Sequence, residues 1–326
     1  MLERINPSKV GLCEERLERV TDWLDQQIES QRLAGASVLV ARHGSIGYSH
    51  AAGLADVEQA KPFTEDTLVR IFSMTKPVTS VAAMMLYEQG CFQLDDPVAK
   101  YLPEFAQTPV WKGGAHALNE VEAQASPMLV KHLFTHTSGL TYGFMNTNVV
   151  DAQYREQGLE FPGKPDNLAQ WVEQLASVPL ICQPGSQWNY SVATDVLGRL
   201  VEVWSGQELA VFFRERIFGP LGMTDTAFAV APEQQQRFAA LYAPLSGGDM
   251  SSVGSKSSPT VDEPRGGLKL MESSLKSSYF KQPKLCSGGG GLTGSIGDYA
   301  KFCQMLLNGG ELNGARLLSP TTVNFM

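Results

Sequence analysis

The chain has 326 residues, of which 43 % are apolar and 18 % are charged. This composition supplies enough apolar side chains for a sizeable core and excludes a disordered or fibrous protein. The net charge is −8, and no basic run offsets it. We therefore expect neither a nucleic-acid partner nor binding to an anionic membrane surface.

Three features of the sequence indicate in which cellular compartment the protein is found: its N-terminus, its apolar runs and its cysteines. Met1–Pro7 has no apolar signal-peptide core, and the apolar run around Val78–Leu86 is about half the length that spans a bilayer. No Cys-x-x-Cys pair suggests zinc or redox chemistry. We predict a cytoplasmic protein without a membrane span, and reduced thiols at all five cysteines. These are Cys13, Cys91, Cys182, Cys286 and Cys303.

Residue periodicity predicts a helix followed by a β-hairpin near the N-terminus. Apolar residues recur at helical spacing over Leu17–Ile28. Ser37–Ala41 and Ile46–Ala51 have the composition of two strands, and His43-Gly44 fits the turn between them. A helix followed by two antiparallel strands predicts a sheet with helices on its outside.

Helical patterns separated by loops fill the rest of the chain. A helix is predicted from Met74 to Glu88, and Ser319-Pro320 begins another that the chain end at Met326 interrupts, so we expect a chain that ends inside an element. Further helices are predicted at 128–134, 167–176, 192–206 and after Ser295, and irregular or loop segments at 105–127, 141–165 and 246–259.

Ser73 and Lys76 form the first pair that suggests chemistry. At a helix start, residues three apart share a face, so the Lys76 amine can reach the Ser73 hydroxyl. Unpaired N–H groups and the positive end of the helix dipole favour a developing oxyanion there, and a serine needs a basic partner to become a nucleophile. The Ser-x-x-Lys spacing recurs at Ser273 and Ser278. The alternative for Ser73 is therefore a helix-capping serine beside a solvated lysine.

Four ordered blocks carry a family resemblance. They are Ser73-Met-Thr-Lys-Pro-Val-Thr-Ser, Lys131-His-Leu-Phe-Thr-His-Thr-Ser-Gly-Leu140, Pro184-Gly-Ser-Gln-Trp-Asn-Tyr-Ser191 and Gly288-Gly-Gly-Gly-Leu292. Together they resemble the serine β-lactamase and penicillin-binding-protein superfamily, in its class C-like branch and close to family VIII carboxylesterases. The resemblance extends from about Pro7 to Met326.

The resemblance implies an α/β (α+β) fold, a three-layer sandwich in which helices flank an antiparallel sheet. Residues 1–326 would form one β-lactamase-like domain that is truncated at its C-terminus, with C-terminal strands missing. Residues 1–74 and 216–326 would form its α/β part, and residues 75–215 an inserted, mostly helical part.

The resemblance also implies a serine hydrolase that needs no cofactor and no metal. Ser73 would be acylated by the substrate carbonyl, Lys76 would help to deprotonate it, and Tyr190 would pass the proton to the leaving group and activate the deacylating water. The expected substrate is a small-molecule ester or amide, most readily a short-chain or aromatic carboxylic ester. The alternatives are a β-lactamase or D-amino-peptide or amide hydrolase and, in another class, a non-catalytic penicillin-binding-like sensor or binding protein.

Two departures from the family pattern affect this prediction. β-Lactamases have Tyr-x-Asn where this chain has Tyr190-Ser191-Val192, so an apolar side chain replaces an amide partner, which favours esters. A third motif (Lys-Thr-Gly, His-x-Gly or Trp-Gly-Gly) does not occur between Arg316 and Met326. Its strand would supply an oxyanion-hole N–H, whose loss costs about 10²–10³ in rate. We therefore expect a fragment of a longer product, with a site that is inert or weakened.

Other residues have simpler interpretations. No Gly-x-Ser-x-Gly elbow of a Ser-His-Asp esterase is present. His136 is expected to orient the following loop by hydrogen bonds to the backbone rather than to act as a base. The glycines at 288–291 lack a phosphate-loop frame and are expected to form a tight turn beside the site. Candidates for a pocket wall, with a place in the core as the alternative, are Trp111, Tyr142, Phe144, Trp188 and Val192.

Overall fold

The computed structural model describes residues 3–160, 165–245 and 267–326, so the predicted loop at 246–259 lies outside the described residues. Contacts between residues divide the chain into two compact units. Unit 1 comprises Met1–Arg70, Phe218–Gln282 and Thr293–Arg316, and unit 2 comprises Ile71–Ile217, Pro283–Leu292 and Leu317–Met326. Among the described helices, none has the length and apolar character needed to cross a bilayer.

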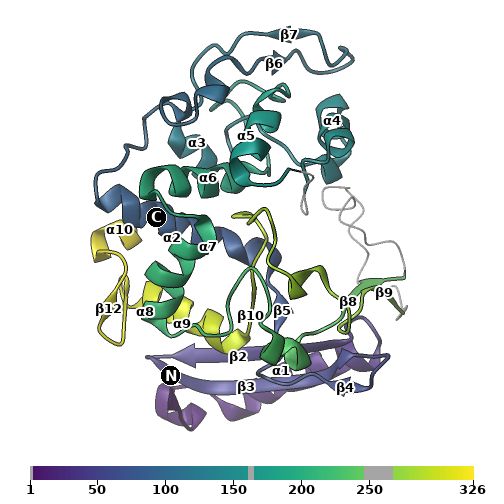
Figure 1. The fold of residues 1–326 in the computed structure, drawn as a ribbon. Helices are drawn as coiled ribbons and strands as arrows, with labels where there is room; N and C mark the ends of the chain where they lie inside the picture. The colour runs from purple at the N-terminus through teal and green to yellow at the C-terminus, as the bar shows by residue number, and fades with distance from the viewer. Residues whose placement is uncertain (1–2, 161–164, 246–266) are drawn as a thin grey trace. The chain divides into compact units, whose positions relative to one another are not determined.

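Unit 1 contains a small mixed sheet, drawn in purple in Figure 1. The predicted hairpin is confirmed: β2 (Gly35–Arg42) pairs antiparallel with β3 (Ser45–Asp56) across a turn at His43-Gly44, where both residues have positive φ. However, β1 (Glu3–Arg4) pairs parallel with β3. The sheet is therefore not purely antiparallel as predicted, because the long connection between β1 and β3 allows a parallel pairing.

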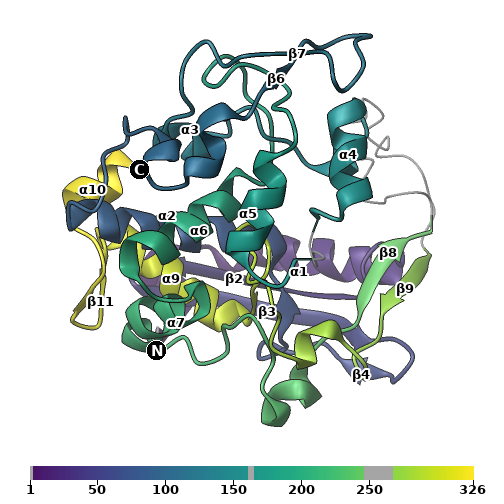
Figure 2. The same ribbon diagram turned by 45° about the horizontal axis from the view of Figure 1, so that its top comes forward.

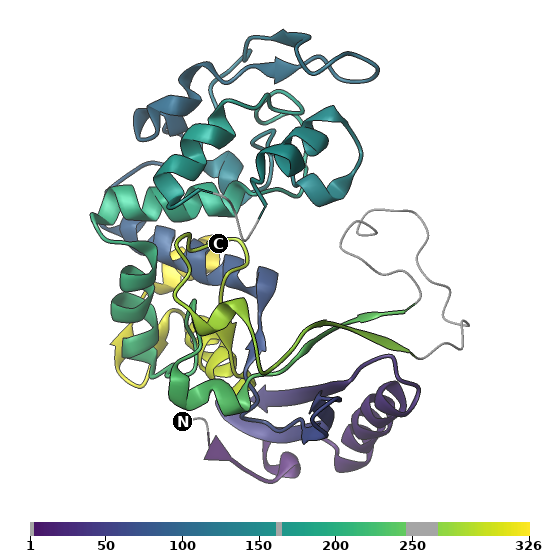
Figure 3. The same ribbon diagram turned by 45° about the vertical axis from the view of Figure 1, so that its right-hand side comes forward.

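Helices of unit 1 pack against this sheet. The predicted N-terminal helix is α1 (Glu14–Glu29), which packs against β3, and α9 (Ile296–Leu307) packs against β2. Strands β8 (Leu241–Pro244) and β9 (Leu268–Glu272) form the two-stranded ribbon visible in Figure 3. Further elements among the described residues of unit 1 include β4 (Lys61–Pro62), β5 (Val69–Arg70), α8 (Gly219–Leu221), β10 (Thr293–Gly294), β11 (Glu311–Leu312) and β12 (Ala315–Arg316).

Unit 2 is mostly helical and is built around two predicted helices that pack against each other, α2 (Thr75–Glu88) and α6 (Ala193–Ser205) (Figure 2). Most residues of both helices are buried, so this pair forms much of the core of the unit. Ser73 and Tyr190 immediately precede these helices. Other α-helices of unit 2 include α3 (Val130–Phe134), α5 (Leu168–Ala176), α7 (Leu209–Phe213) and α10 (Pro320–Phe325).

Two segments of unit 2 that the sequence predicted as irregular contain regular structure. Within 105–127, β6 (Val110–Trp111) pairs with β7 (Val121–Glu122). Within 141–165 lies the helix α4 (Val149–Gln157). Its signals are present in the sequence: the Asn148 side chain accepts from two N–H groups of the first turn, and Gly158 ends the helix with φ 66°.

Two segments in the C-terminal part of the sequence belong to unit 2, the mostly helical unit, whereas the sequence prediction placed them in the α/β part. Residues 283–292 join unit 2 because the Gly288 carbonyl accepts from Thr79 Oγ1 of α2 at 2.6 Å. Residues 317–326 join it, and there the Ser319 N–H donates to Glu88 Oε1 at the end of α2, at 2.7 Å.

Candidate active site

Ser73 lies in a short 3-10 turn, Phe72–Met74, that leads into α2. Phe72 has φ 42°, a left-handed conformation that is unfavourable for a bulky residue, so the backbone is strained directly before the serine. Ser73 Oγ lies 2.6 Å from Tyr190 Oη and accepts a hydrogen bond from Lys76 Nζ at 3.2 Å. The structure thus brings together the three residues that the sequence selected for catalysis.

The ε-amine of Lys76 makes three hydrogen bonds to described residues. Besides Ser73 Oγ, the acceptors are Tyr142 Oη at 3.1 Å and the Gly289 carbonyl at 2.7 Å. Three acceptors match the three N–H donors of a lysine ammonium. The Nζ atom also lies 4.7 Å from the ring centroid of Tyr190, within the range of a cation–π interaction.

The sequence predicts Tyr142 as a candidate for the wall of the substrate pocket, and in the structure it also contacts Lys76. Its ring stacks on Phe144 with centroids 4.6 Å apart and lies 5.3 Å from the ring of Tyr190. Burial, and secondly the nearby Asp195 carboxylate, raise the pKa of Tyr142 well above its usual range. Tyr142 therefore stays a neutral phenol, which suits it to accept a hydrogen bond from Lys76.

His136 packs behind Tyr190, with ring centroids 5.0 Å apart. Its carbonyl accepts from the Asn189 N–H at 2.8 Å, and its Nδ1 lies 3.2 Å from Ser191 Oγ. Burial, and then the positive charge of Lys76, lower the pKa of His136 to about 4. His136 thus bonds to both neighbours of Tyr190, to Asn189 through its backbone carbonyl and to Ser191 through its neutral ring, which agrees with a role in orienting a loop.

The glycine segment before β10 is held by side chains of α2 and α6. Asp195 Oδ1 accepts from Ser287 Oγ at 2.5 Å and from the Gly289 N–H at 2.8 Å, while Thr79 holds the Gly288 carbonyl. A Cβ atom on Gly289 would lie 2.4 Å from Asp195 Oδ2, so no larger residue fits without a shift. The predicted tight turn is thus a close approach of backbone to a buried carboxylate.

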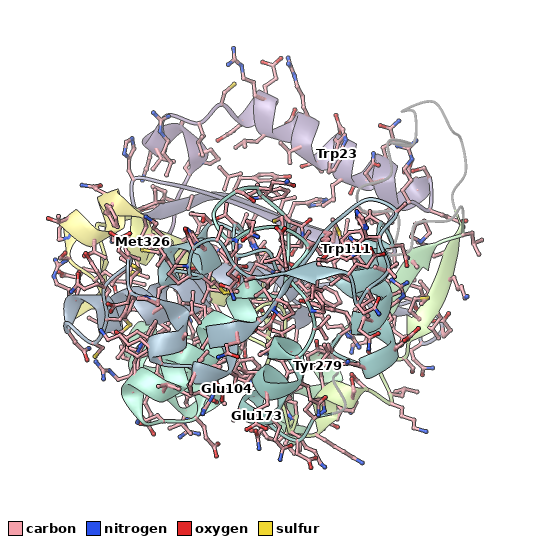
Figure 4. All side chains as sticks on the ribbon, turned by 90° about the horizontal axis from the view of Figure 1, so that it is seen from above. Trp23, Glu104, Trp111, Glu173, Tyr279 and Met326 are labelled. Carbon is pink, nitrogen blue, oxygen red and sulfur yellow. The ribbon has the colours of Figure 1, made fainter. Side chains whose placement is uncertain are left out.

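The other wall candidates differ in exposure. Trp188 is 68 % exposed, and its ring lies 6.5 Å from the ring of Tyr190. Val192 is fully buried and exposes no atom to a substrate. Trp111 is buried in β6, where its indole N–H donates to the His116 carbonyl, and it is labelled in Figure 4.

Sequence reasoning missed the link from Asp195 through Gly289 to Lys76. One signal was present: Asp195 is an acidic residue within an apolar stretch of α6, between Ala193 and Val196-Leu197. Buried acids of this kind are rare unless they are paired or functional.

Comparison with known proteins identifies the family. A family model described as Beta-lactamase matches residues 20–325. The chain belongs to the beta-lactamase family. Esterase EstB of Burkholderia gladioli is 37 % identical over 290 residues, which are 88 % of this chain and 69 % of EstB. Monacolin J acid methylbutanoyltransferase of Aspergillus terreus is 31 % identical over 310 residues, 92 % of this chain and 67 % of the transferase.

A solved structure of this beta-lactamase-type fold supports the same assignment. EstCE1, described as a hydrolase with promiscuous acyltransferase activity, is 30 % identical, with a TM-score of 0.71 over 95 % of this chain and 76 % of EstCE1. The predicted superfamily and its α/β fold are therefore confirmed. With a named esterase among its relatives, the chain is a hydrolytic enzyme of the serine hydrolase type.

Proposed function

We propose that this serine hydrolase is a carboxylesterase that works through an acyl-serine on Ser73. The observation that carries the proposal is the position of Ser73 Oγ, 2.6 Å from Tyr190 Oη and 3.2 Å from Lys76 Nζ. A serine hydroxyl becomes a nucleophile only when a neighbouring group accepts its proton, and here a phenol oxygen and a lysine amine flank it.

In the proposed reaction Tyr190 enters as the phenolate, and its Oη accepts the Ser73 proton while Oγ attacks the ester carbonyl carbon. The carbon–oxygen bond to the alcohol then breaks, and Tyr190 returns the proton to the departing oxygen. A water molecule next attacks the acyl carbon and gives its proton to Tyr190. The carboxylic acid leaves as Tyr190 passes that proton to Ser73 Oγ, which restores both groups to their starting state. Lys76 donates to Ser73 Oγ, and its Nζ lies 4.7 Å from the ring centroid of Tyr190, so it stabilises the negative charge on these two side chains.

The surroundings of Ser73 support an uncharged substrate with an apolar acyl group. Phe72, Met74 and Trp188 are 46 %, 48 % and 68 % exposed, an unusual concentration of accessible apolar side chains beside a polar reaction centre. The donors of Lys76 are occupied by protein acceptors, so it offers none to the carboxylate of a β-lactam antibiotic or a peptide terminus. Short-chain or aromatic esters fit these features best.

The test is hydrolysis of p-nitrophenyl butyrate and of a chromogenic cephalosporin by the gene product and its Ser73→Ala variant. Ester turnover should fall about 10³-fold or more in Ser73→Ala and about 10²–10³-fold in Tyr190→Phe. Ser278→Ala is the matched control, because Ser278 begins the same Ser-x-x-Lys spacing and its N–H and hydroxyl bond to Glu272 in unit 1. It should retain full activity.

Each other outcome points to an alternative. Serine-dependent turnover of the cephalosporin that exceeds ester turnover would make the protein a β-lactamase. Preferential transfer of the acyl group to an added alcohol would make it an acyltransferase. Folded protein that turns over neither substrate in a Ser73-dependent way would contradict the proposal and favour a D-amino-peptide or amide substrate, or a binding protein.

A further inference from the structure

Asp195 is a buried carboxylate that the proposed reaction does not use. It is the third residue of α6 and has no exposed surface. Its Oδ1 accepts from Ser287 and Gly289, but its Oδ2 has no hydrogen-bond partner among the described residues. An incompletely paired carboxylate in a core lowers stability, so its presence requires an explanation beyond packing.

The same residue is connected to the reactive lysine by one glycine. Gly289 donates its N–H to Asp195 Oδ1 at 2.8 Å, and its carbonyl accepts from Lys76 Nζ at 2.7 Å. The preceding carbonyl, of Gly288, is fixed by Thr79 one turn after Lys76 on α2. With both sides held, the Gly289 carbonyl has little freedom to turn away from the lysine.

Asp195 also interacts electrostatically with groups of the site. Burial raises the pKa of Asp195, whereas the Ser287 hydrogen bond and the positive charge of Lys76 lower it. The carboxylate in turn contributes to the raised pKa of Tyr142, which bonds to the same lysine. The carboxylate therefore lies close enough to influence the protonation of groups around Ser73.

We propose that Asp195 is a positioning residue for the esterase reaction. It holds the Gly289 carbonyl against Lys76 and places a buried carboxylate near the lysine amine that bonds to Ser73. This inference rests on the proposed function, because it requires Lys76 to act on Ser73. Ser287, whose hydroxyl donates to Asp195, completes the anchor.

The test compares Asp195→Asn with Asp195→Ala in ester hydrolysis. Asparagine keeps an acceptor for Gly289 but loses the charge, so kcat should fall about 10-fold; alanine loses both, and kcat should fall about 100-fold. KM should stay within about twofold for both variants, because Asp195 is buried away from substrate.

The pH profile separates positioning from a merely structural role. Titratable side chains that face Lys76 or Asp195 are Tyr142 and Tyr190, with His136 behind Tyr190. Removing a negative charge favours the deprotonated form of every neighbour. In the pH profile of kcat/KM, the acidic and the alkaline limb of Asp195→Asn should therefore both lie at lower pH than those of the wild type, by about 0.5 pH unit or more.

Asp298→Asn is the matched control, because Asp298 is also a buried third residue of a helix, in unit 1. Its kcat/KM profile per folded molecule should match that of the wild type. The rate at which a fluorophosphonate labels Ser73 provides a second readout that does not depend on the substrate. Labelling should slow in both Asp195 variants while circular dichroism shows a folded chain.

Two results would overturn the inference in distinguishable ways. If the wild type labels at Ser73 and folded Asp195→Asn keeps the wild-type rate and pH profile, Asp195 has no positioning role and the proposed function stands. If the folded wild type shows neither Ser73 labelling nor Ser73-dependent turnover, the proposed function fails and this inference fails with it.

Discussion

Asp195 and Asp298 occupy equivalent positions in two helices but have different surroundings. Each is the third residue of its helix, α6 in unit 2 and α9 in unit 1, and each is buried. Asp298 Oδ2 accepts from the Asp225 N–H at 2.7 Å and from Thr226 Oγ1 at 3.1 Å, and Oδ1 accepts from Lys301 Nζ at 2.7 Å. Within the described part of the chain, Asp195 has donors on Oδ1 only.

The comparison shows that position in a helix does not determine what a buried acid does. Both aspartates lie in a first helical turn, where the dipole favours a negative charge. Asp298 has a cation and donors on both oxygens, so its charge is well compensated and stabilises the fold. The negative charge of Asp195 is less well compensated than that of Asp298, and Asp195 lies next to the glycine that contacts Lys76. This arrangement is expected of a residue that serves activity.

The largest effect expected from this comparison is on stability, at Asp298. Asp298→Asn should lower the free energy of unfolding by about 3 kcal/mol, because it leaves the Lys301 ammonium, whose side chain is 18 % exposed, without its carboxylate partner. Urea titration at pH 7 measures this loss. A stability loss below about 1 kcal/mol would show that Asp298 is no better compensated than Asp195, and the contrast would disappear.

A pair of glycines tests the same contrast through sterics. In Gly289→Ala the new Cβ would lie 2.4 Å from Asp195 Oδ2, so the anchor must shift, and kcat should fall about 10- to 100-fold. In Gly297→Ala, beside Asp298, the Cβ would meet no described atom within 4 Å, apart from its chain neighbours and the nearby backbone of its own helix. That variant should keep its activity and gain about 0.5–1 kcal/mol of stability, because alanine is the better helix former.

Steady-state kinetics and urea titration of the two glycine variants measure both expectations. Equal kcat values for Gly289→Ala and the wild type would mean that the Gly289 carbonyl can move without consequence. The link from Asp195 to Lys76 would then be a packing feature only.

Local sequence signals predicted much of the fold. Helices α2 and α6 and the β2–β3 hairpin have strong apolar periods or turn signals, so they could be placed from the sequence. Helix α4 was missed although Asn148 and Gly158 mark its ends, because the aromatic-rich segment around it lacks a clear period. The β6–β7 pair was missed because two-residue strands carry no period at all.

The site was predictable where its residues are close in sequence or belong to a family block. Ser73 and Lys76 follow from helical spacing, and Tyr190 follows from the resemblance alone. The contact of Tyr142 with Lys76 and the anchoring of Gly289 by Asp195 join segments 66 and 94 residues apart. No local pattern encodes such contacts, since they arise when α2, α6 and the glycine segment pack together.

The smallest expected effect is the change in stability of Asp195→Asn. Burial raises the pKa of Asp195 above its ordinary value of 3.8. Between 3.8 and the raised pKa, the folded chain keeps a proton that the unfolded chain has lost, so wild-type stability falls as pH rises through this window. Asparagine does not titrate. At pH 7 the variant should therefore be as stable as the wild type or more stable, by less than about 1 kcal/mol.

The stability difference in favour of Asp195→Asn should become smaller as the pH falls toward 3.8. The wild-type side chain is then protonated and as neutral as asparagine. Urea midpoints of both proteins between pH 4 and pH 7 measure the trend. A loss of about 3 kcal/mol at pH 7, like that expected for Asp298→Asn, would show that the Asp195 carboxylate stabilises the fold. A slower but equally stable Asp195→Asn enzyme would instead separate the two aspartates, with Asp298 serving stability and Asp195 serving the reaction.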